Sequence, residues 1–214
     1  MSIIKQESQR VAIFIDAQNL YHTARNLYNS NVNFKSILED TLQNRKLIKA
    51  VAYVITTESK EESNFFDALE KAGIETKSKD LQIFYDGNKK ADWDVGIAVD
   101  AIRLSPKVDA VILVSGDGDF IPLVEYLKFH SGCQVECATF KESASSGLLN
   151  VVDDFIDLSE NKKRYIIPTS KNFKKYKKKN NQKKEKQKNI QKVKLKKENQ
   201  KPNLKQRKKP NNKK

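Results

Sequence analysis

Residues 108–130, VDAVILVSGDGDFIPLVEYLKFH, decide the fold. A run of β-branched and other apolar residues ends at Val114, and a second apolar segment, with helical spacing, follows Phe120. Between them stand a serine, two glycines and two aspartates. A short buried strand that leads directly into a helix is the unit from which parallel sheets are built. The sequence therefore predicts that Asp117 and Asp119 lie at the carboxyl end of a strand.

The same alternation of strand and helix recurs along the chain. Short apolar runs that predict strands occupy 10–16, 47–56, 74–87 (with a short hairpin partner), 108–115 and 133–140. Apolar residues recur with helical spacing, which predicts helices, over 17–28, 34–43, 62–73, 92–104, 119–130 and 145–158. Near-continuous apolar strands that alternate with helices predict a Rossmann-like, three-layer α/β/α fold with a mainly parallel central sheet.

Charge divides the chain into three expected parts: a short extension over 1–9, a folded domain over 10–160 and a lysine-rich tail over 161–214. The whole chain carries +14, but the tail holds 24 of the 41 Lys and Arg and two of the 27 Asp and Glu, which gives it +22 and leaves −8 for the rest. A domain of about 150 residues can bury a substantial core. The tail has too few apolar residues to fold, so we expect it to be disordered.

Several classes of protein are excluded by what the sequence lacks. No apolar stretch reaches the roughly 18 residues of a membrane span, and no signal peptide precedes the first strand. Phosphate-binding P-loop, dinucleotide-binding and G-x-S-x-G motifs are also missing. Cys133 and Cys137 are expected to be buried thiols in a reducing compartment, which favours a cytoplasmic location. His22 and His130 have no metal-site spacing and are expected in the core or on the surface.

Acidic residues follow two of the expected strands. Asp16 ends the first strand, and Asp117 and Asp119 follow the strand quoted above. If these strands are neighbours in a parallel sheet, their carboxyl ends meet at one edge, where such sheets bind ligands. Asp92 and Asp94 open a helix that can bring a further acid to this edge.

The acids of the expected helix over 92–104 can be ranked as site candidates by their position relative to its apolar stripe. Its expected buried stripe consists of Val95, Ala98, Val99 and Ile102. Asp92 and Asp94 then lie at the two margins of the stripe, and we rank Asp94 above Asp92 as a site residue. Asp100 lies opposite the stripe and is expected to face water.

Helix capping is the alternative explanation for these acids. Asp16, Asp92 and Asp119 each precede a helix, where an aspartate cap contributes about 1 kcal/mol. Asp117 lies between two glycines that would allow a tight turn, and it has no comparable capping role. Clustered carboxylates raise one another's pKa unless a cation is present, and an oxygen-only cluster suits Mg²⁺ or Mn²⁺ rather than zinc. Such an ion lowers the pKa of a bound water and neutralises phosphate charge, which is the chemistry of phosphodiester hydrolysis.

Three segments together resemble the NYN domain family in its LabA-like branch: FIDAQNL (14–20), KADWDVGIAVDAI (90–102) and VSGDGDF (114–120). The resemblance covers about residues 10–158. It implies a PIN-like fold, related to the flap-type nucleases, with a metal-dependent ribonuclease site. Carried over residue by residue, it places the site at Asp16, Asn19, Asp94, Asp117 and Asp119.

We therefore expect a Mg²⁺- or Mn²⁺-dependent endoribonuclease that hydrolyses phosphodiester bonds with metal-activated water, RNA being favoured over DNA. Asp16, Asp94, Asp117 and Asp119 are the expected metal ligands, with Asp92 as a secondary candidate. Asn19 is expected to orient a ligand or the scissile phosphate, and the basic tail to tether nucleic acid.

Two alternatives stay open. The first is a non-catalytic nucleic-acid-binding or regulatory module that retains the NYN fold. The second is a Toprim-like phosphotransfer domain, which would have a glutamate at the end of the first strand, where this sequence has Asp16. The sequence also leaves open whether the chain forms a homo-oligomer.

Overall fold

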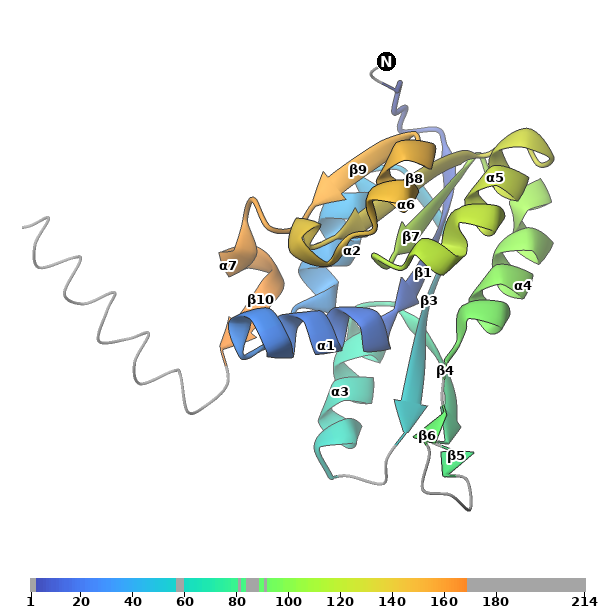
Figure 1. Cartoon of the computed structure of the whole chain (residues 1–214). Helices are drawn as coiled ribbons and strands as arrows, with labels where there is room; N and C mark the ends of the chain where they lie inside the picture. Colours follow the sequence, from blue (N-terminus) through green and yellow to red (C-terminus); the bar gives the residue numbers. More distant parts are fainter. Residues whose placement is uncertain (1–2, 57–59, 81, 84–88, 91, 169–214) are drawn as a thin grey trace, which may run out of the picture. The chain divides into compact units, whose positions relative to one another are not determined.

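The computed structural model describes residues 3–56, 60–80, 82–83, 89–90 and 92–168 (Figure 1). Contacts divide the chain into two compact units, Met1–Ile167 and Pro168–Lys214, and only Pro168 of the second unit is among the described residues. The expected tail from residue 169 onward, and residues 81 and 84–87 of the expected hairpin region, lie outside the described residues.

A six-stranded parallel sheet forms the centre of the first unit, in the order β4-β3-β1-β7-β8-β9. Its strands are β1 (Arg10–Asp16), β3 (Lys46–Thr56), β4 (Glu75–Asp80), β7 (Ala110–Val114), β8 (Gln134–Thr139) and β9 (Asp154–Asp157). The strand order runs outward in opposite directions from β1 and from β7, so the topological switch point lies between these two strands. This is the position at which doubly wound sheets bind ligands, at the carboxyl ends of the strands.

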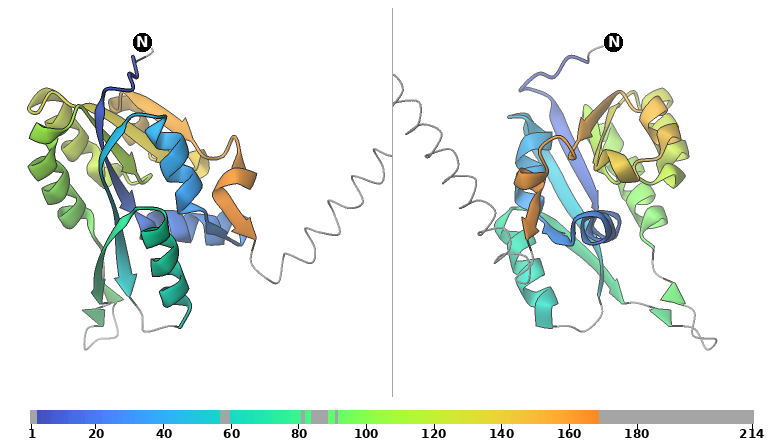
Figure 2. Two further views of the ribbon diagram at one scale, coloured as in Figure 1. Left: turned by 180° about the vertical axis from the view of Figure 1, so that it is seen from behind. Right: turned by 60° about the vertical axis from the view of Figure 1, so that its left-hand side comes forward.

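Helices cover both faces of the sheet, which confirms the expected three-layer fold (Figure 2). One face carries α1 (Ala17–Tyr28), α2 (Phe34–Leu42) and α3 (Lys60–Lys71). The other carries α4 (Asp94–Leu104), α5 (Ile121–Phe129) and α6 (Ser146–Val151). The alternation along β1 explains both layers, because Ile13 and Ile15 pack into the first core and Ala12 and Phe14 into the second.

Short elements complete the unit. Three 3₁₀ turns are η1 (Ser105–Lys107), η2 (Gly118–Phe120) and η3 (Lys141–Ser143). The remaining elements are α7 (Lys162–Tyr165) and two small two-stranded sheets, β2 (Ser30–Val32) with β10 (Ile166–Pro168) and β5 (Gln82–Ile83) with β6 (Lys89–Lys90). Tyr165 is buried, and its hydroxyl donates a hydrogen bond to Asp40 at 2.9 Å. The chain therefore continues to pack on this unit after residue 160.

The expected helix over 145–158 is wrong in its second half. The helix α6 ends at Val151, and residues 154–157 form the edge strand β9, paired in parallel with β8. Asp153 directs this change, because its carboxylate accepts a hydrogen bond from the backbone N–H of Val135 at 2.8 Å and pairs with Lys128 at 2.9 Å. Pairing with the edge of the sheet thus outweighs the helical spacing of the sequence.

The expected buried stripe of α4 is wrong at three of its four positions, because Ala98 alone of its members packs partly buried against the core. Val95 is 74% exposed, and Val99 and Ile102 are exposed as well, whereas Ile97 and Ala101 are the buried residues of this helix. The helix is apolar on more than one side, so periodicity alone did not select the side that packs. The buried side carries residues at i+3 and i+7 from Asp94, which directs Asp94 toward the sheet.

Asp100 does not face water as expected. It is half-buried and accepts hydrogen bonds from the hydroxyl of Tyr53 at 2.6 Å and from Nζ of Lys77 at 2.5 Å. Burial raises the pKa of Asp100, but these two hydrogen bonds and the charge of Lys77 lower it further, so the net shift is downward. Asp100 therefore ties α4 to β3 and β4.

Both cysteines are buried free thiols, and burial raises the pKa of Cys137 to about 12. They pack as small apolar residues, as expected from the sequence. Among the described residues, no helix is both long and apolar enough to cross a lipid bilayer.

Candidate metal centre

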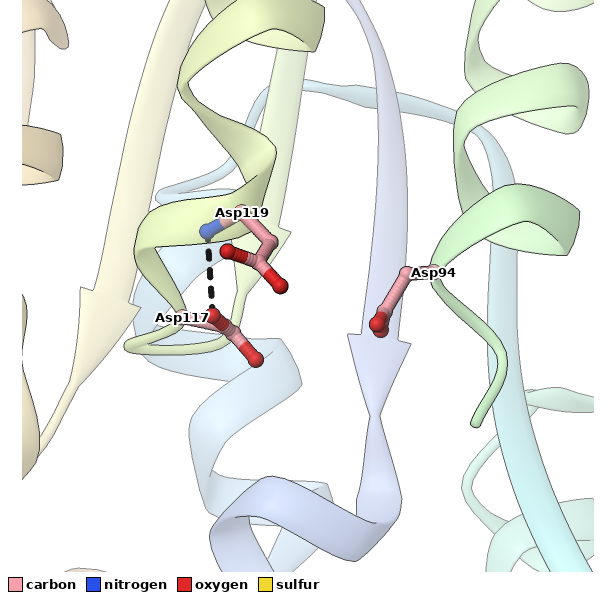
Figure 3. Close-up of side chains that lie close together, drawn as sticks. All are labelled: Asp94, Asp117 and Asp119. Carbon is pink, nitrogen blue, oxygen red and sulfur yellow. Dashed lines mark hydrogen bonds between the residues drawn. The ribbon is translucent and has the colours of Figure 1, made fainter. Parts of the chain in front are cut away.

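Three acids that the sequence placed in one site lie together in the structure. Asp94, Asp117 and Asp119 each offer a carboxylate oxygen, and these oxygens lie within 4.8 Å of one another. Figure 3 shows Asp94 at the start of α4 directed toward Asp117 and Asp119, which come from the loop after β7. The cluster therefore lies at the switch point between β1 and β7, where the topology predicts a ligand site.

Close packing against backbone, rather than a positive φ, requires the glycine at 116, whereas Gly118 packs against a side chain. Among the described glycines, Gly73 and Gly132 have positive φ, and Gly116 and Gly118 do not. A Cβ on Gly116 would lie 2.7 Å from the backbone oxygen of Ser143, and one on Gly118 would lie 2.8 Å from Oγ of Ser145. The loop after β8 thus packs directly on the Asp117 loop and fixes its position.

The expected capping roles of Asp117 and Asp119 are exchanged. Asp117 is the N-cap of η2, and its Oδ1 accepts a hydrogen bond from the backbone N–H of Asp119 at 3.0 Å. Asp119 is exposed and does not cap α5, whose N-cap is Phe120. Asp119 therefore has no structural role in the described contacts, and Asp117 has one that uses only one of its two oxygens.

Asp16 lies beside the three acids but outside their group. It is buried and caps α1, with Oδ1 accepting a hydrogen bond from the backbone N–H of Asn19 at 3.0 Å. Its Oδ2 accepts a hydrogen bond from the hydroxyl of Ser115 at 3.2 Å. Both oxygens of Asp16 are thus engaged by the protein, so this residue holds β1, α1 and the β7 loop together.

Asn19 of α1 and Ser115, the first residue after β7, both hold the same loop in place. The side-chain oxygen of Asn19 accepts a hydrogen bond from the backbone N–H of Gly116 at 3.2 Å. Oγ of Ser115 accepts one from the backbone N–H of Asp117 at 3.3 Å while it donates to Asp16. Since the oxygen of the Asn19 amide is used in this way, its NH₂ group is the end that remains for a ligand.

Burial and mutual repulsion both disfavour negative charge at the site, and burial is the larger cause. Burial, followed by the charges of Asp16, Asp117, Asp92 and Asp119, raises the pKa of Asp94 from 3.8 to about 6. Burial also raises the pKa of Asp16, against the hydrogen bonds from Asn19 and Ser115, and the charge of Asp117 adds to the rise. Within the described part of the chain, no Lys or Arg pairs with Asp94, Asp117 or Asp119. A group of carboxylates with no protein cation fits a divalent metal ion.

Asp94→Asn is expected to stabilise the metal-free protein at pH 7. The folded state holds a proton on Asp94 up to about pH 6, whereas the unfolded chain loses it near 3.8. Stability therefore falls as pH rises between these values, and the full cost remains above pH 6. Solvent screening reduces that cost to on the order of 1 kcal/mol. Thermal unfolding in EDTA should show a higher Tm for the variant at pH 7 and a smaller difference near pH 4.

The control for this prediction is the same melt with Mn²⁺. Added metal should raise the Tm of the wild-type protein and reverse the ranking, because only the wild type has the full ligand set. A lower Tm for Asp94→Asn in EDTA at pH 7 would contradict the raised pKa of Asp94.

A pocket of about 410 Å³ opens beside the acids. It includes Asp16, Asn19, Asp94 and Asp117, and also Asp92, which is exposed and lies outside the group of three. Asp92 contributes through its charge, which is one of those that raise the pKa of Asp94.

Comparison with known proteins agrees with this geometry. The family model of the NYN domain matches residues 10–159, a span that contains the whole sheet and every acid of the site. The chain belongs to the NYN domain family. The NYN domain is a PIN-like nuclease domain, and nucleases of this kind use divalent metals. An aspartate cluster that could hold such an ion is present in this chain.

Two relatives support the assignment to the NYN family. The Low amplitude and bright protein LabA of Synechococcus elongatus is 27% identical over 166 residues, which cover 71% of this chain and 84% of LabA. The crystal structure of a protein of unknown function from Vibrio parahaemolyticus is 33% identical, with a TM-score of 0.69, and the match covers 77% of this chain and all of that one.

Some residues of this NYN domain site were missed from the sequence. Gln18, His22 and Asn26 of α1 line the pocket, and so does Trp93, whose indole N–H donates a hydrogen bond to the backbone oxygen of Val54 at 2.9 Å. The spacing of i, i+4 and i+8 places the three α1 residues on one side of the helix. That spacing was visible in the sequence, but only the path of α1 beside the acids shows that this side faces the site.

Proposed function

We propose that this NYN domain is a Mg²⁺- or Mn²⁺-dependent endoribonuclease that hydrolyses phosphodiester bonds in RNA. The observation that carries the proposal is the convergence of Asp94, Asp117 and Asp119 at the switch point of the sheet, where none of the described Lys or Arg residues pairs with them. The nuclease character of the family supports the reaction class. RNA rather than DNA is the part of the proposal that rests on the family resemblance.

In this proposal Asp94, Asp117 and Asp119 hold the metal. Asp16 is the fourth member of the expected ligand set, but both of its oxygens accept hydrogen bonds from the protein. We therefore assign Asp16 mainly to holding the Asp117 loop, with its negative charge adding to the attraction for the cation. Asp92 adds charge at the exposed margin of the pocket.

A divalent ion bound by these acids would supply Lewis-acid chemistry, which neutralises phosphate charge and lowers the pKa of water. The chain itself contributes position and charge. The NH₂ group of Asn19 can donate to a non-bridging phosphate oxygen, because the amide oxygen is bound to the N–H of Gly116. The carboxylates repel a polyanion until the cation is bound, so nucleic acid binds productively only after the metal.

The direct test is cleavage of labelled RNA and DNA of the same sequence with Mg²⁺, Mn²⁺ or EDTA. The proposal predicts internal cuts in RNA with either metal, slower cleavage of DNA, and no cleavage in EDTA. Binding without cleavage under all metal conditions would refute the enzyme and favour a regulatory module that retains the fold.

The lysine-rich tail is proposed to tether the nucleic acid. Removal of residues 169–214 leaves the buried Tyr165 in place and removes 21 Lys and Arg. We expect at least about tenfold weaker RNA binding at low salt and a flatter dependence of affinity on salt, because fewer counterions are released. The measurement is fluorescence anisotropy of an RNA oligonucleotide at several salt concentrations.

A tail of equal length built from Gly and Ser is the matched control, and it should behave like the truncation. Unchanged affinity and salt slope in the truncated protein would contradict the tether. We place the protein in the cytoplasm as part of this proposal, since the two free thiols fit a reducing compartment.

A further inference from the structure

The neighbouring helices α4 and α5, which cover the same face of the sheet, carry large apolar side chains that are exposed to water (Figure 1). They are Val95, Val99 and Ile102 of α4 and Tyr126 and Phe129 of α5, and we call them the α4–α5 face. Phe129 is 84% exposed. The five residues make up half of the ten large apolar side chains that are exposed in the described part of the chain. Single exposed apolar residues are common, but several on adjacent helices indicate an interaction surface.

The apolar residues of α4 have the spacing of a helix–helix seam. Val95, Val99 and Ile102 follow one another at intervals of four and three residues, which places them on one side of the helix. The same spacing led to the expectation of a buried stripe. Because the sheet buries Ile97 and Ala101 instead, α4 has a second apolar side that remains exposed. A side of this kind fits another helix.

The charges along α4 indicate which helix fits its exposed side. Asp92 and Asp94 stand at the amino end of α4, and Arg103 and Lys107 stand at and beyond its carboxyl end. Arg103 and Lys107 are exposed, and neither forms a salt bridge with a described residue. A second α4 that runs antiparallel therefore presents a basic end to the acidic end and an acidic end to the basic one.

The apolar and the charged residues agree on one register. When Val95 of one α4 lies opposite Ile102 of an antiparallel copy, the midpoint of the pair falls beside Val99. One step back along the first helix is one step forward along the second. Arg103 of each copy then lies level with Asp94 of the other, within the reach of a long side chain from the exposed Asp92.

We propose that the α4–α5 face binds a second copy of this chain, with the two α4 helices antiparallel about a two-fold axis near Val99. A two-fold interface requires a surface that complements itself, and this face does so in its apolar seam and in its charges. A stable interface buries at least about 1,000 Å² in total, more than a short helix pair supplies. The aromatic side chains of Tyr126 and Phe129, each with about 150–250 Å² to bury, extend the contact on both copies.

The pairing has a consequence for the acidic pocket. None of the described residues that line this pocket is Lys or Arg. In the proposed dimer, Arg103 of the second copy brings a cation to the rim at Asp92 and Asp94, where a polyanion would approach. This consequence rests on the proposed nuclease function, whereas the interface itself does not.

The first test is the mass of the full chain, measured by sedimentation equilibrium in EDTA at raised salt, which screens contacts of the basic tail. With increasing concentration in the micromolar range, the mass of the wild type should rise from that of one chain toward that of two. Val99→Lys should weaken this association at least about tenfold, because it places a charge in the apolar seam. A wild type that stays monomeric throughout this range would overturn the proposal.

Ile48→Lys is the matched control. Ile48 lies on β3 and is 40% exposed, against 47% for Val99, so both substitutions place a lysine at a half-exposed apolar position. The control should associate like the wild type, and both variants should keep the wild-type circular dichroism spectrum. Association that survives Val99→Lys would place the interface elsewhere and refute the α4–α5 face.

A cross-link tests the register of the two helices. In the variant Val99→Cys the new thiols of two copies should meet at the axis and form a disulfide-linked dimer with oxidised glutathione, seen on a non-reducing gel. The variant Ile48→Cys and the wild type, whose own cysteines are buried, should give no such dimer. A dimer in solution without the cross-link in Val99→Cys would contradict the antiparallel arrangement.

The contribution of Arg103 is tested in the presence and absence of the interface. Arg103→Gln should raise KM for RNA about two- to fivefold, the scale of one exposed charge contact. The same substitution in the Val99→Lys background should have no effect, since the second copy is then absent. Equal effects in both backgrounds would mean that Arg103 acts within its own chain. If no RNA is cut, the nuclease proposal fails, and the mass and the cross-link still decide the interface.

Discussion

Asp117→Asn is expected to lower metal-dependent RNA cleavage at least about 100-fold, the scale of losing an electrostatic group that acts on the reacting phosphate. Asn keeps an oxygen that can accept the hydrogen bond from the backbone N–H of Asp119, so η2 should remain capped. The variant removes one negative charge from a cluster of like charges, so we expect it to fold at least as stably as the wild type in EDTA. The loss would then report the site rather than the fold.

Asp92→Asn is the matched control for this experiment. Asp92 lines the same pocket, and its replacement by Asn removes the same charge as Asp117→Asn. Asp92 itself lies outside the group of three acids. Cleavage rates with saturating Mn²⁺ should therefore fall much less than in Asp117→Asn. Equal losses in the two variants would mean that overall negative charge, and not the placement of Asp117, supports cleavage.

The largest expected loss of stability comes from Arg45→Met, at the amino end of the sheet. Arg45 and Glu136 are buried and form a bidentate ion pair, and Nη2 of Arg45 also donates to the backbone oxygen of Thr41 at 2.8 Å. Its removal leaves Glu136 in the core with Lys5, 3.0 Å away, as its remaining ion partner among the described residues. We expect the free energy of unfolding to fall by about 3–5 kcal/mol, measured in urea.

The double variant Arg45→Met, Glu136→Leu separates the cost of an unpaired buried charge from the cost of altered packing. Because no uncompensated charge is then buried, its stability should return most of the way to that of the wild type. A single variant within about 1 kcal/mol of the wild type would show that Lys5 and the surrounding polar groups compensate for the lost arginine.

The fold was predictable from the sequence because its signals are local and agree with one another. Apolar runs such as AVILV (110–114), each followed by a helical segment, predict a parallel sheet between two layers of helices. The position of Asp16 and Asp117 at strand ends then follows directly. What the sequence did not give was the strand order, which is set by pairing between distant segments and which brings these two strand ends together.

The errors have a common physical cause, since each depends on a partner that is distant in the sequence. The side of α4 that packs is set by the sheet, so Ile97 and Ala101 are buried while Val95 is exposed. The carboxylate of Asp153 accepts a hydrogen bond from the backbone N–H of Val135, which stabilises the start of the edge strand in place of a longer helix. Gly116 is explained by the backbone of Ser143 and not by a turn. Local sequence patterns identified the acidic residues of the site but not the long-range contacts that position them.

The central claim is that Asp94, Asp117 and Asp119 form a metal centre. Anomalous diffraction from crystals of this protein soaked with Mn²⁺ tests it most directly, because the ion itself is located. The account predicts an anomalous peak at coordination distance from carboxylate oxygens of these three residues, and no peak there in crystals of Asp117→Asn. A Mn²⁺ peak bound elsewhere on the domain, with no density between these acids, would contradict it.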